Sequence, residues 1–508
     1  MADFPVFDFL ASRADLYPDR MAMEMADGSR NRTYQQLHHR SNCAAGLLTE
    51  LGLSAGDRLA ILCRNRIEFF ELLFACARVA VILVPLNWRM PAGELRPILE
   101  DCGAGWLIHG DEDAATAESL AENGPGLINL DDRTGKGYER RLEETQALAQ
   151  CRIWQADETW FLIYTSGTTG TPKAVIQTFG MALANYINLT QALGMRADDT
   201  TLNFLPLFHT AGINIPTLPA LMMGSRVIVT PGFDLEYTLN LIRAGGIDMF
   251  FGVPAVYQAI SLHPDFPGLD LSRVRSWGCG GAPLPDPLFR RFSEQGATVL
   301  NGMGMTETGP TAFLMDGANA HRKVGSVGKP HIMTAVRLIG EDGKDVPRGA
   351  AGEVWYSGLG ITPGYFKRPE ETNAAFSGGW LRSGDLARQD EDGYYYVVGR
   401  LKDMFISGGE NVYPAEIERQ LSELPEVLEA AVVGIPDETW GEVGCAYLMA
   451  RPGYQLPSDA ELTRKLQSTL AHYKIPKQFI EMVEFPRTAA GKIRKHLLPS
   501  PATNPPGR

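Results

Sequence analysis

A loop of small and hydroxylated residues between two apolar segments has a composition that suits phosphate groups. Residues 160–164 and 174–176 show the apolar and β-branched runs of buried strands. The two glycines of the loop permit backbone conformations that turn amide groups toward an anion, while hydroxyls and one lysine add further donors. The sequence therefore predicts a polyphosphate-binding loop made of Thr165, Ser166, Gly167, Thr168, Thr169, Gly170 and Lys173.

This loop differs from the Walker phosphate loop, in which Gly-Lys-Ser/Thr leads into a helix. Here Pro172 precedes Lys173, Ala174 follows it, and β-branched residues come next. The pattern therefore disfavours a Walker nucleotide triphosphatase. A plain surface linker is the other alternative, but it does not explain why the loop joins two buried strands and ends in a Pro-Lys pair.

Five further segments contain residues that could do chemistry, and each also has a purely structural interpretation. His209 closes an apolar run, which is more often typical of a packed histidine. The glycines near residue 280 could admit a flat ligand against the backbone or form a tight strand-to-helix turn. Glu307 could hold a hard cation or be a solvated carboxylate. Asp385 could accept from two sugar hydroxyls or sit in a β-turn, and Lys492 lies in a basic tail segment.

In this order, the segments resemble the signature motifs of the adenylate-forming superfamily, which includes acyl- and aryl-CoA synthetases, peptide-synthetase adenylation domains and beetle luciferases. The resemblance covers nearly the whole chain. It implies an acid–thiol ligase that uses ATP, magnesium (Mg²⁺) and coenzyme A. In such an enzyme a carboxylate attacks the α-phosphorus of ATP, which gives an acyl-adenylate and pyrophosphate, and a thiol then displaces AMP.

The resemblance also implies a role for each matching residue. Lys492 matches the catalytic lysine of the C-terminal domain, Lys402 matches the hinge, and His209 matches a gate between the acyl pocket and the thiol route. Met303 departs from the family's adenine-stacking tyrosine, although a thioether can also cover a purine face. The remaining implied contacts are Thr306 with the α-phosphate, Glu307 with magnesium, Gly280, Gly281, Ala282, Pro283, Asn301, Gly302 and Met303 with the adenylate, Asp385 and Arg400 with the ribose or phosphate, and Ser407, Gly408 and Gly409 with the arm of coenzyme A.

The elements that must position these residues alternate between strands and helices. Helical spacing at 34–51 and 68–79 alternates with strand-like runs at 58–63 and 81–85, and the alternation recurs between 181 and 230. This order predicts parallel α/β layers. After residue 402, a helix at 414–424, strands at 428–435 and 443–450, and a helix opened by a capping box at Ser458 predict a small α+β unit.

We therefore predict an α/β fold in two domains. A large N-terminal adenylate-forming domain, residues 1–401, combines mixed α/β layers with a β-rich subdomain. A small mobile C-terminal α+β domain, residues 402–498, follows a hinge near Lys402. The Pro-rich residues 499–508 are predicted to be a disordered tail.

Composition limits the classes of partner. The 508 residues, 44% hydrophobic, can fill two or more cores, and a net charge of −13 with dispersed cations disfavours nucleic acid. The seven cysteines contain no Cys-x-x-Cys pair, which disfavours disulfides and structural zinc. Without a signal peptide or an apolar run of the roughly 20 residues that a membrane span needs, we predict a cytoplasmic protein with no integral membrane segment. The sequence leaves a homodimer open.

The segments predicted to line the acyl pocket, at 209–215, 253–257 and 303–314, contain no Lys or Arg. A dicarboxylic acid would need a cation there, so we expect a monocarboxylic acid with an apolar tail, either fatty or aryl/phenylpropenoid. Free coenzyme A is the expected thiol because no carrier module follows the small domain. The alternatives are an acyl-AMP ligase that loads a carrier protein and a non-catalytic nucleotide-binding homologue.

Overall fold

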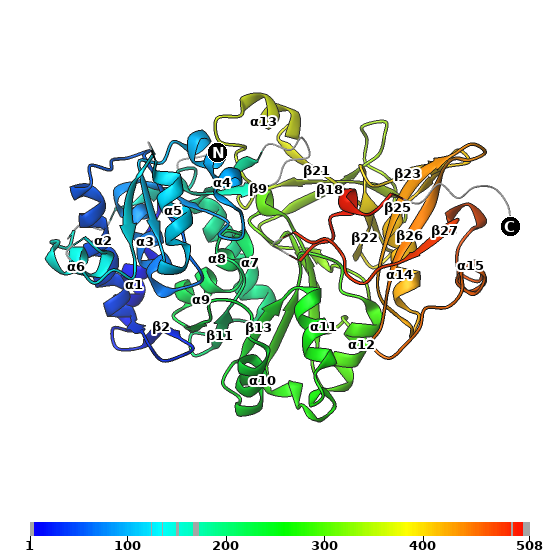
Figure 1. Cartoon of the computed structure of the whole chain (residues 1–508), viewed down its shortest axis with the longest axis horizontal. Helices are drawn as coiled ribbons and strands as arrows, with labels where there is room; N and C mark the ends of the chain where they lie inside the picture. The colour runs from blue at the N-terminus through cyan, green and yellow to red at the C-terminus, as the bar shows by residue number, and fades with distance from the viewer. Residues whose placement is uncertain are drawn as a thin grey trace.

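The computed structural model describes residues 5–122, 124–134, 136–148, 152–165, 172–488 and 491–500. This part of the chain contains four large sheets, and the second of them includes two strands that precede the first sheet in the sequence (Figure 1). The first has the strand order β10-β9-β5-β4-β6-β7, in which β10 is antiparallel to β9 and the other pairs are parallel. The strands are β4 Arg58–Leu62, β5 Ile82–Pro85, β6 Trp106–His109, β7 Gly126–Asn129, β9 Thr159–Thr165 and β10 Lys173–Thr178.

The second sheet has the order β17-β16-β15-β14-β13-β11-β12-β2-β3, and its strands from β15 to β2 are parallel. The predicted parallel α/β layers are therefore confirmed. The strands are β2 Met21–Met25, β3 Asn31–Thr33, β11 Thr200–Asn203, β12 Arg226–Val229, β13 Met249–Gly252, β14 Ser276–Cys279, β15 Val299–Met303, β16 Phe313–Leu314 and β17 Lys329–Pro330.

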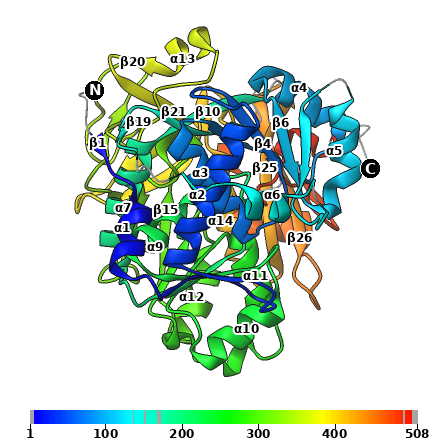
Figure 2. The ribbon, with the colours of Figure 1, turned by 90° about the vertical axis from the view of Figure 1, so that its left-hand side faces the viewer.

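Helices connect and cover these two sheets. Helix α3, Ile67–Val79, is buried on all sides between Ile67 and Arg78, as expected for a helix in a core rather than on a surface. Seen from the N-terminal side, α2 and α3 cross the front of the molecule and the small domain lies behind them (Figure 2). The other helices of this part are α1 Phe9–Leu16, α2 Tyr34–Glu50, α4 Ala92–Cys102, α5 Ala114–Ala121, α6 Tyr138–Glu144, α7 Phe179–Leu193, α8 Thr210–Asn214, α9 Thr217–Met223, α10 Leu235–Ala244, α11 Pro254–Leu262 and α12 Asp286–Glu294.

The third sheet is antiparallel and corresponds to the predicted β-rich subdomain. Its last two strands form an antiparallel hairpin, which brings Asp385 of the first strand opposite Arg400 at the end of the second. Its elements are β18 Ala335–Ile339, β19 Ala351–Ser357, α13 Pro369–Ala375, β20 Phe376–Ser377, β21 Trp380–Gln389 and β22 Tyr395–Arg400.

The fourth sheet and two helices form the small C-terminal domain, as predicted. Helices α14 and α15 pack on one face of the sheet, and the final segment with Ile493 and Leu498 packs on the other. The capping box at Ser458 is present. The Tyr447 hydroxyl donates to the Pro499 carbonyl at 2.6 Å, while residues 501–508 lie outside the described ranges. The elements are β23 Phe405–Ser407, β24 Glu410–Val412, α14 Pro414–Ser422, β25 Val427–Asp437, β26 Gly441–Ala450, α15 Asp459–Gln467 and β27 Gln478–Glu481.

Two ion pairs join the small domain to the large one. Arg419 of α14 donates to Asp286 Oδ2 of α12 through both Nε and Nη2, at 3.0 and 2.6 Å. Arg290 of α12 pairs with Glu423, just after α14. Asp286 is buried, so its bond to Arg419 is better shielded from water than the second pair, whose side chains are exposed. We call these the α12/α14 ion pairs.

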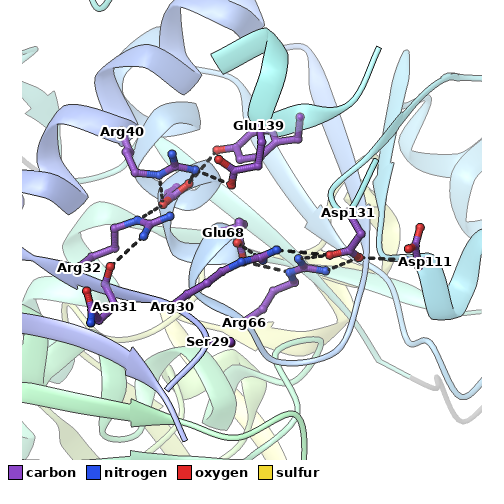
Figure 3. A network of polar contacts seen from close by, with 12 residues as sticks. Ser29, Arg30, Asn31, Arg32, Arg40, Arg66, Glu68, Asp111, Asp131 and Glu139 are labelled. Atoms are coloured by element: carbon purple, nitrogen blue, oxygen red, sulfur yellow. Dashed lines mark hydrogen bonds and ion pairs between the residues drawn. The ribbon is translucent and has the colours of Figure 1, made fainter. Parts of the chain in front are cut away.

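A buried carboxylate holds the N-terminal hairpin against the first sheet (Figure 3). Glu68 opens α3 with a side chain that has no exposed surface, and it pairs with Arg30 and Arg66. Arg66 also donates to both oxygens of Asp131, at 2.9 and 2.7 Å. This network connects the end of the β2–β3 hairpin, α3 and the loop after β7.

We expect Glu68→Ala to lower the free energy of unfolding by roughly 3 kcal/mol, because it leaves two guanidinium groups without a buried counter-charge. Urea unfolding followed by circular dichroism measures the change. Glu143→Ala is the matched control, since Glu143 pairs with Arg140 at an exposed site and such pairs contribute little. Equal effects of the two substitutions would contradict the structural role of the network.

Candidate active site

The ends of the predicted phosphate loop lie on a strand hairpin. Thr165 ends β9, Lys173 begins β10, and the two residues pair across the strands. The Thr165 hydroxyl lies 3.4 Å from the Lys173 carbonyl. The two predicted strands on either side of the loop are therefore confirmed. Ser166, Gly167, Thr168, Thr169 and Gly170 lie outside the described residues, and their contact with phosphate stays a prediction.

Thr306 and Glu307 form a short 3-10 turn, Thr306–Thr308, that is tied to β10. Gln177 Nε2 donates to the Thr306 carbonyl at 2.9 Å. The Tyr365 hydroxyl donates to Glu307 Oε1, also at 2.9 Å. Burial raises the pKa of Glu307, while the hydrogen bond from Tyr365 and the charge of Arg400 act in the opposite direction. Glu307 is thus a buried carboxyl group and not the solvated one of the alternative interpretation.

Asp385 and Arg400 form a cross-strand pair at the end of the third sheet. Arg400 Nε donates to Asp385 Oδ1 at 2.9 Å. Burial raises the pKa of Asp385, and the charges of Arg400 and Lys492 counteract this effect. A buried carboxylate beside a guanidinium can accept from sugar hydroxyls, so the geometry is compatible with the predicted ribose contact.

Lys492 extends from the small domain toward these carboxylates. Its position is fixed by a tight turn in which the Thr488 amide donates to the Lys492 carbonyl at 2.7 Å. Partial removal from water lowers the pKa of Lys492 and Arg400 lowers it further, whereas Asp385 and Glu307 raise it. Lys492 also keeps solvent-exposed surface. Lys492 therefore lies within electrostatic reach of three predicted site residues from the large domain.

His209 directly precedes α8 and lies near the same lysine. Burial, followed by the charges of Lys492 and Arg89, lowers the pKa of His209 to about 4. Its ring packs against Phe208, with centroids 4.8 Å apart, and its Nε2 is buried without a partner in the part of the chain that the structure describes. His209 is consequently neutral near pH 7, which suits a gate better than a cationic contact.

The low pKa of His209 predicts a pH-dependent stability. Because the unfolded histidine titrates near pH 6.5, the unfolded state binds more protons between about pH 6.5 and 4. Stability should therefore fall as the pH is lowered through this window, by about 2 kcal/mol at pH 5 for this histidine. His209→Asn should reduce the difference in urea stability between pH 7.5 and 5, whereas the exposed His496→Asn should not. An unchanged difference in the His209 variant would refute the assignment.

The predicted adenine-side residues lie on neighbouring parallel strands. Gly280, Gly281, Ala282 and Pro283 follow β14 and precede α12, so the tight strand-to-helix turn is confirmed. A Cβ on Gly280 would lie 3.2 Å from the Phe251 ring, and Gly281 has φ +82°. Asn301, Gly302 and Met303 complete β15. Their contact with adenine stays a prediction.

The residues predicted to meet coenzyme A lie at a hairpin of the small domain, where Ser407 is buried and the two glycines face solvent. Ser407, Gly408 and Gly409 form the turn between β23 and β24, and both glycines are exposed. The Gly408 amide donates to the Trp440 carbonyl at 2.9 Å. Lys402 lies in an exposed turn between the third and fourth sheets, where a hinge could operate. The small domain therefore presents Lys492, and not Gly408, toward the predicted nucleotide site.

Sequence reasoning missed Tyr365 and Thr362, which connect the predicted phosphate and magnesium segments. The Thr362 hydroxyl donates to the Ile176 carbonyl of β10 at 2.7 Å, and its amide donates to the Glu307 carbonyl at 2.8 Å. Neither residue follows an apolar run or belongs to a cluster of charges. The adjacent Gly364 and Tyr365 were the signal that the sequence offered at this position, but their types do not reveal which strand they contact.

No group of three or more His, Cys, Asp or Glu side chains within the described ranges could hold a metal ion. The carboxylate of Glu307 is an oxygen donor of the kind that magnesium prefers, and phosphate oxygens of a bound nucleotide could supply further ligands. No helix of the described chain has the length and apolar character needed to cross a membrane. The cytoplasmic location and the homodimer stay predictions.

Comparison with known proteins identifies the family. The family model of AMP-binding enzymes matches residues 10–366, and that of the AMP-binding enzyme C-terminal domain matches residues 416–492. The chain belongs to the AMP-binding enzymes. It is 39% identical over 483 residues to a feruloyl-CoA synthase of Amycolatopsis sp, covering 95% of the chain and 96% of that relative. It is 35% identical over 493 residues to an indoleacetate–CoA ligase of Aromatoleum aromaticum, covering 96% of each.

Solved structures of AMP-binding enzymes agree over the same length. The o-succinylbenzoate CoA synthetase of Bacillus subtilis with its acyl-adenylate intermediate has a TM-score of 0.86 and 32% identity, covering 97% of this chain and 98% of that one. Its structure with ATP and a magnesium ion has a TM-score of 0.86 and 31% identity, covering 98% and 100%. The chain is an AMP-forming acid–thiol ligase of the acyl- and aryl-CoA synthetase branch, as predicted.

Proposed function

We propose that this ligase activates an apolar-tailed monocarboxylic acid in two steps. In the first, the carboxylate attacks the α-phosphorus of ATP, the bond to pyrophosphate breaks, and an acyl-adenylate forms. In the second, the thiol of coenzyme A attacks the acyl carbon, AMP leaves, and a thioester forms. A carboxylate is a poor acyl donor and its mixed anhydride with AMP is a good one, which is why the first step is needed.

The observation that carries this proposal is the position of Lys492. The small domain brings one cation to the buried carboxyl groups Glu307 and Asp385, which belong to two different segments of the large domain. A fixed cation directed at charge that develops on the attacked phosphate is typically among the largest contributions to such catalysis. We assign this role to Lys492.

The other predicted residues complete the site. The loop that ends at Lys173 would hold the β- and γ-phosphates, Thr306 would meet the α-phosphate, and Asp385 with Arg400 would bind the ribose. Magnesium, held by Glu307 and phosphate oxygens, would screen the repulsion between the carboxylate and the triphosphate. Burial of Glu307 supports this role because a cation compensates a buried carboxylate.

The second step requires a different face of the small domain. Gly408 and Gly409 are turned to solvent while Lys492 faces the site, so one orientation cannot serve both steps. We propose that residues 402–498 rotate about Lys402, which withdraws Lys492 and presents Ser407, Gly408 and Gly409 to the thiol. His209 would then open the route of the thiol to the acyl group.

The acid is proposed to be aryl or fatty. The absence of Lys and Arg from the three predicted pocket segments supports an apolar tail. The names of the two compared relatives, feruloyl-CoA synthase and indoleacetate–CoA ligase, favour the aryl class.

Pyrophosphate release with a panel of acids tests the proposal. The panel should contain phenylpropenoid, arylacetic, medium-chain and long-chain acids, with malonate as the dicarboxylate control, each with and without coenzyme A. We expect release with an apolar acid and thioester formation only with coenzyme A. Release without any thioester would favour the carrier-loading ligase, and ATP binding without release would favour the non-catalytic homologue.

A further inference from the structure

Tyr365 contacts Lys173 and Glu307, the residues that we propose to hold the phosphates and the magnesium of bound ATP. Residues 364–366 extend the free edge of β10: Ile176 donates to the Gly364 carbonyl at 3.1 Å, and Phe366 donates to the Ala174 carbonyl at 2.9 Å. Tyr365 is thereby bridged to Val175. Side chains two residues apart on a strand share a face, so the pairing also sets Tyr365 diagonally across from Lys173.

The two ends of the Tyr365 side chain have different contacts. Its hydroxyl donates to Glu307 Oε1 at 2.9 Å. Lys173 Nζ lies 5.6 Å from the centroid of its ring, within the range of a cation–π contact. One half-buried side chain thus contacts the lysine that ends the phosphate loop and the carboxylate assigned to magnesium.

We propose that Tyr365 is a positioning residue that sets Lys173 and Glu307 for the magnesium complex of ATP, an inference that rests on the proposed function. A hydrogen bond to Oε1 fixes the rotation of the Glu307 carboxylate and hence the direction of its second oxygen. The ring face restricts the flexible Lys173 side chain, which would otherwise lose more conformational freedom on binding. The two contacts are also coupled, because a shift of residues 364–366 along β10 would displace both.

Tyr365→Phe separates the two contacts, because it keeps the ring and removes the hydroxyl. Binding of ATP is measured by equilibrium dialysis over a series of magnesium concentrations, so the readout does not require turnover. We expect the half-saturating magnesium concentration to rise about five- to tenfold, while the affinity for ATP at saturating magnesium changes less than twofold. Tyr365→Leu should weaken ATP binding at saturating magnesium as well, because the ring is lost.

Tyr394→Phe is the matched control. The Tyr394 hydroxyl donates to Asp316 Oδ2 at 2.7 Å, and Lys329 Nζ lies 4.6 Å from its ring centroid, so it makes the same pair of contacts outside the candidate site. This variant should bind magnesium and ATP as the unmodified protein does. Equal magnesium dependence in the Tyr365→Phe variant and the unmodified protein would overturn the inference.

A double-mutant cycle distinguishes an effect that passes through Glu307 from a general disturbance of the structure. If the hydroxyl acts through Glu307, Tyr365→Phe should change the magnesium requirement less than twofold in a Glu307→Gln background. Additive changes would mean that Tyr365 acts elsewhere and would refute the proposal. Should the unmodified protein bind ATP yet activate no acid, the proposed function would fail, and the same binding series would still decide the role of Tyr365.

Discussion

Lys492→Ala is expected to reduce acyl-adenylate formation by at least a thousandfold while thioester formation from supplied acyl-adenylate stays within about threefold of the unmodified enzyme. The first step loses the cation that faces the attacked phosphate, and a loss of this size corresponds to about 4 kcal/mol of transition-state stabilisation. The second step would use the opposite face of the small domain and should not need this cation. Acid-dependent pyrophosphate release and thioester formation measure the two steps separately.

The control for this prediction is Lys495→Ala. Lys495 is three residues away, and it pairs with Glu418 of its own domain at 2.7 Å. Its substitution tests whether any loss of charge in the segment has the same effect. Parallel losses of both half-reactions in the Lys492 variant, with an unchanged unfolding midpoint, would contradict the model of two faces.

Gly408→Ala is expected to have the opposite effect, a loss of about a hundredfold in thioester formation with adenylate formation preserved. Gly408 has φ +61°, and a Cβ there would lie 2.6 Å from a Trp440 ring carbon. The turn must therefore shift, since left-handed backbone costs about 1–2 kcal/mol for a residue with a Cβ and the aromatic ring cannot yield freely. The displaced turn would obstruct the passage proposed for the arm of coenzyme A.

Gly453→Ala separates backbone strain from obstruction. Gly453 belongs to the same domain and has φ +83°, but a Cβ there would meet no atom within 4 Å. It should lower the stability of the small domain without changing the ratio of the two half-reactions. If both variants reduced thioester formation equally, the loss would reflect a weakened domain and not a blocked passage.

Periodic patterns made much of this fold predictable from sequence. The helix predicted at 68–79 is Ile67–Val79 and the strand predicted at 58–63 is Arg58–Leu62, because each follows from local hydrophobic spacing. The capping box at Ser458 was readable for the same reason, since its partners are three residues apart. Motif order along the chain was sufficient to predict the superfamily.

Features that depend on contacts between distant segments were not predictable. Tyr365 is 58 residues from Glu307, and their hydrogen bond exists because the free edge of β10 pairs with residues near 365. The low pKa of His209 likewise arises from burial and from a lysine of the other domain. A sequence pattern gives the side chain types at these positions but not which loop will fold against which edge.

The α12/α14 ion pairs should make the rate of domain rotation depend on the salt concentration. Both pairs must separate if the small domain turns between the two half-reactions, so they would slow the rotation, and dissolved ions would weaken chiefly the exposed Arg290–Glu423 pair. A moderate salt concentration should therefore speed the change from adenylate formation to thioester formation when that rotation limits turnover. The rate of the chemical step within either half-reaction should not depend on these ion pairs.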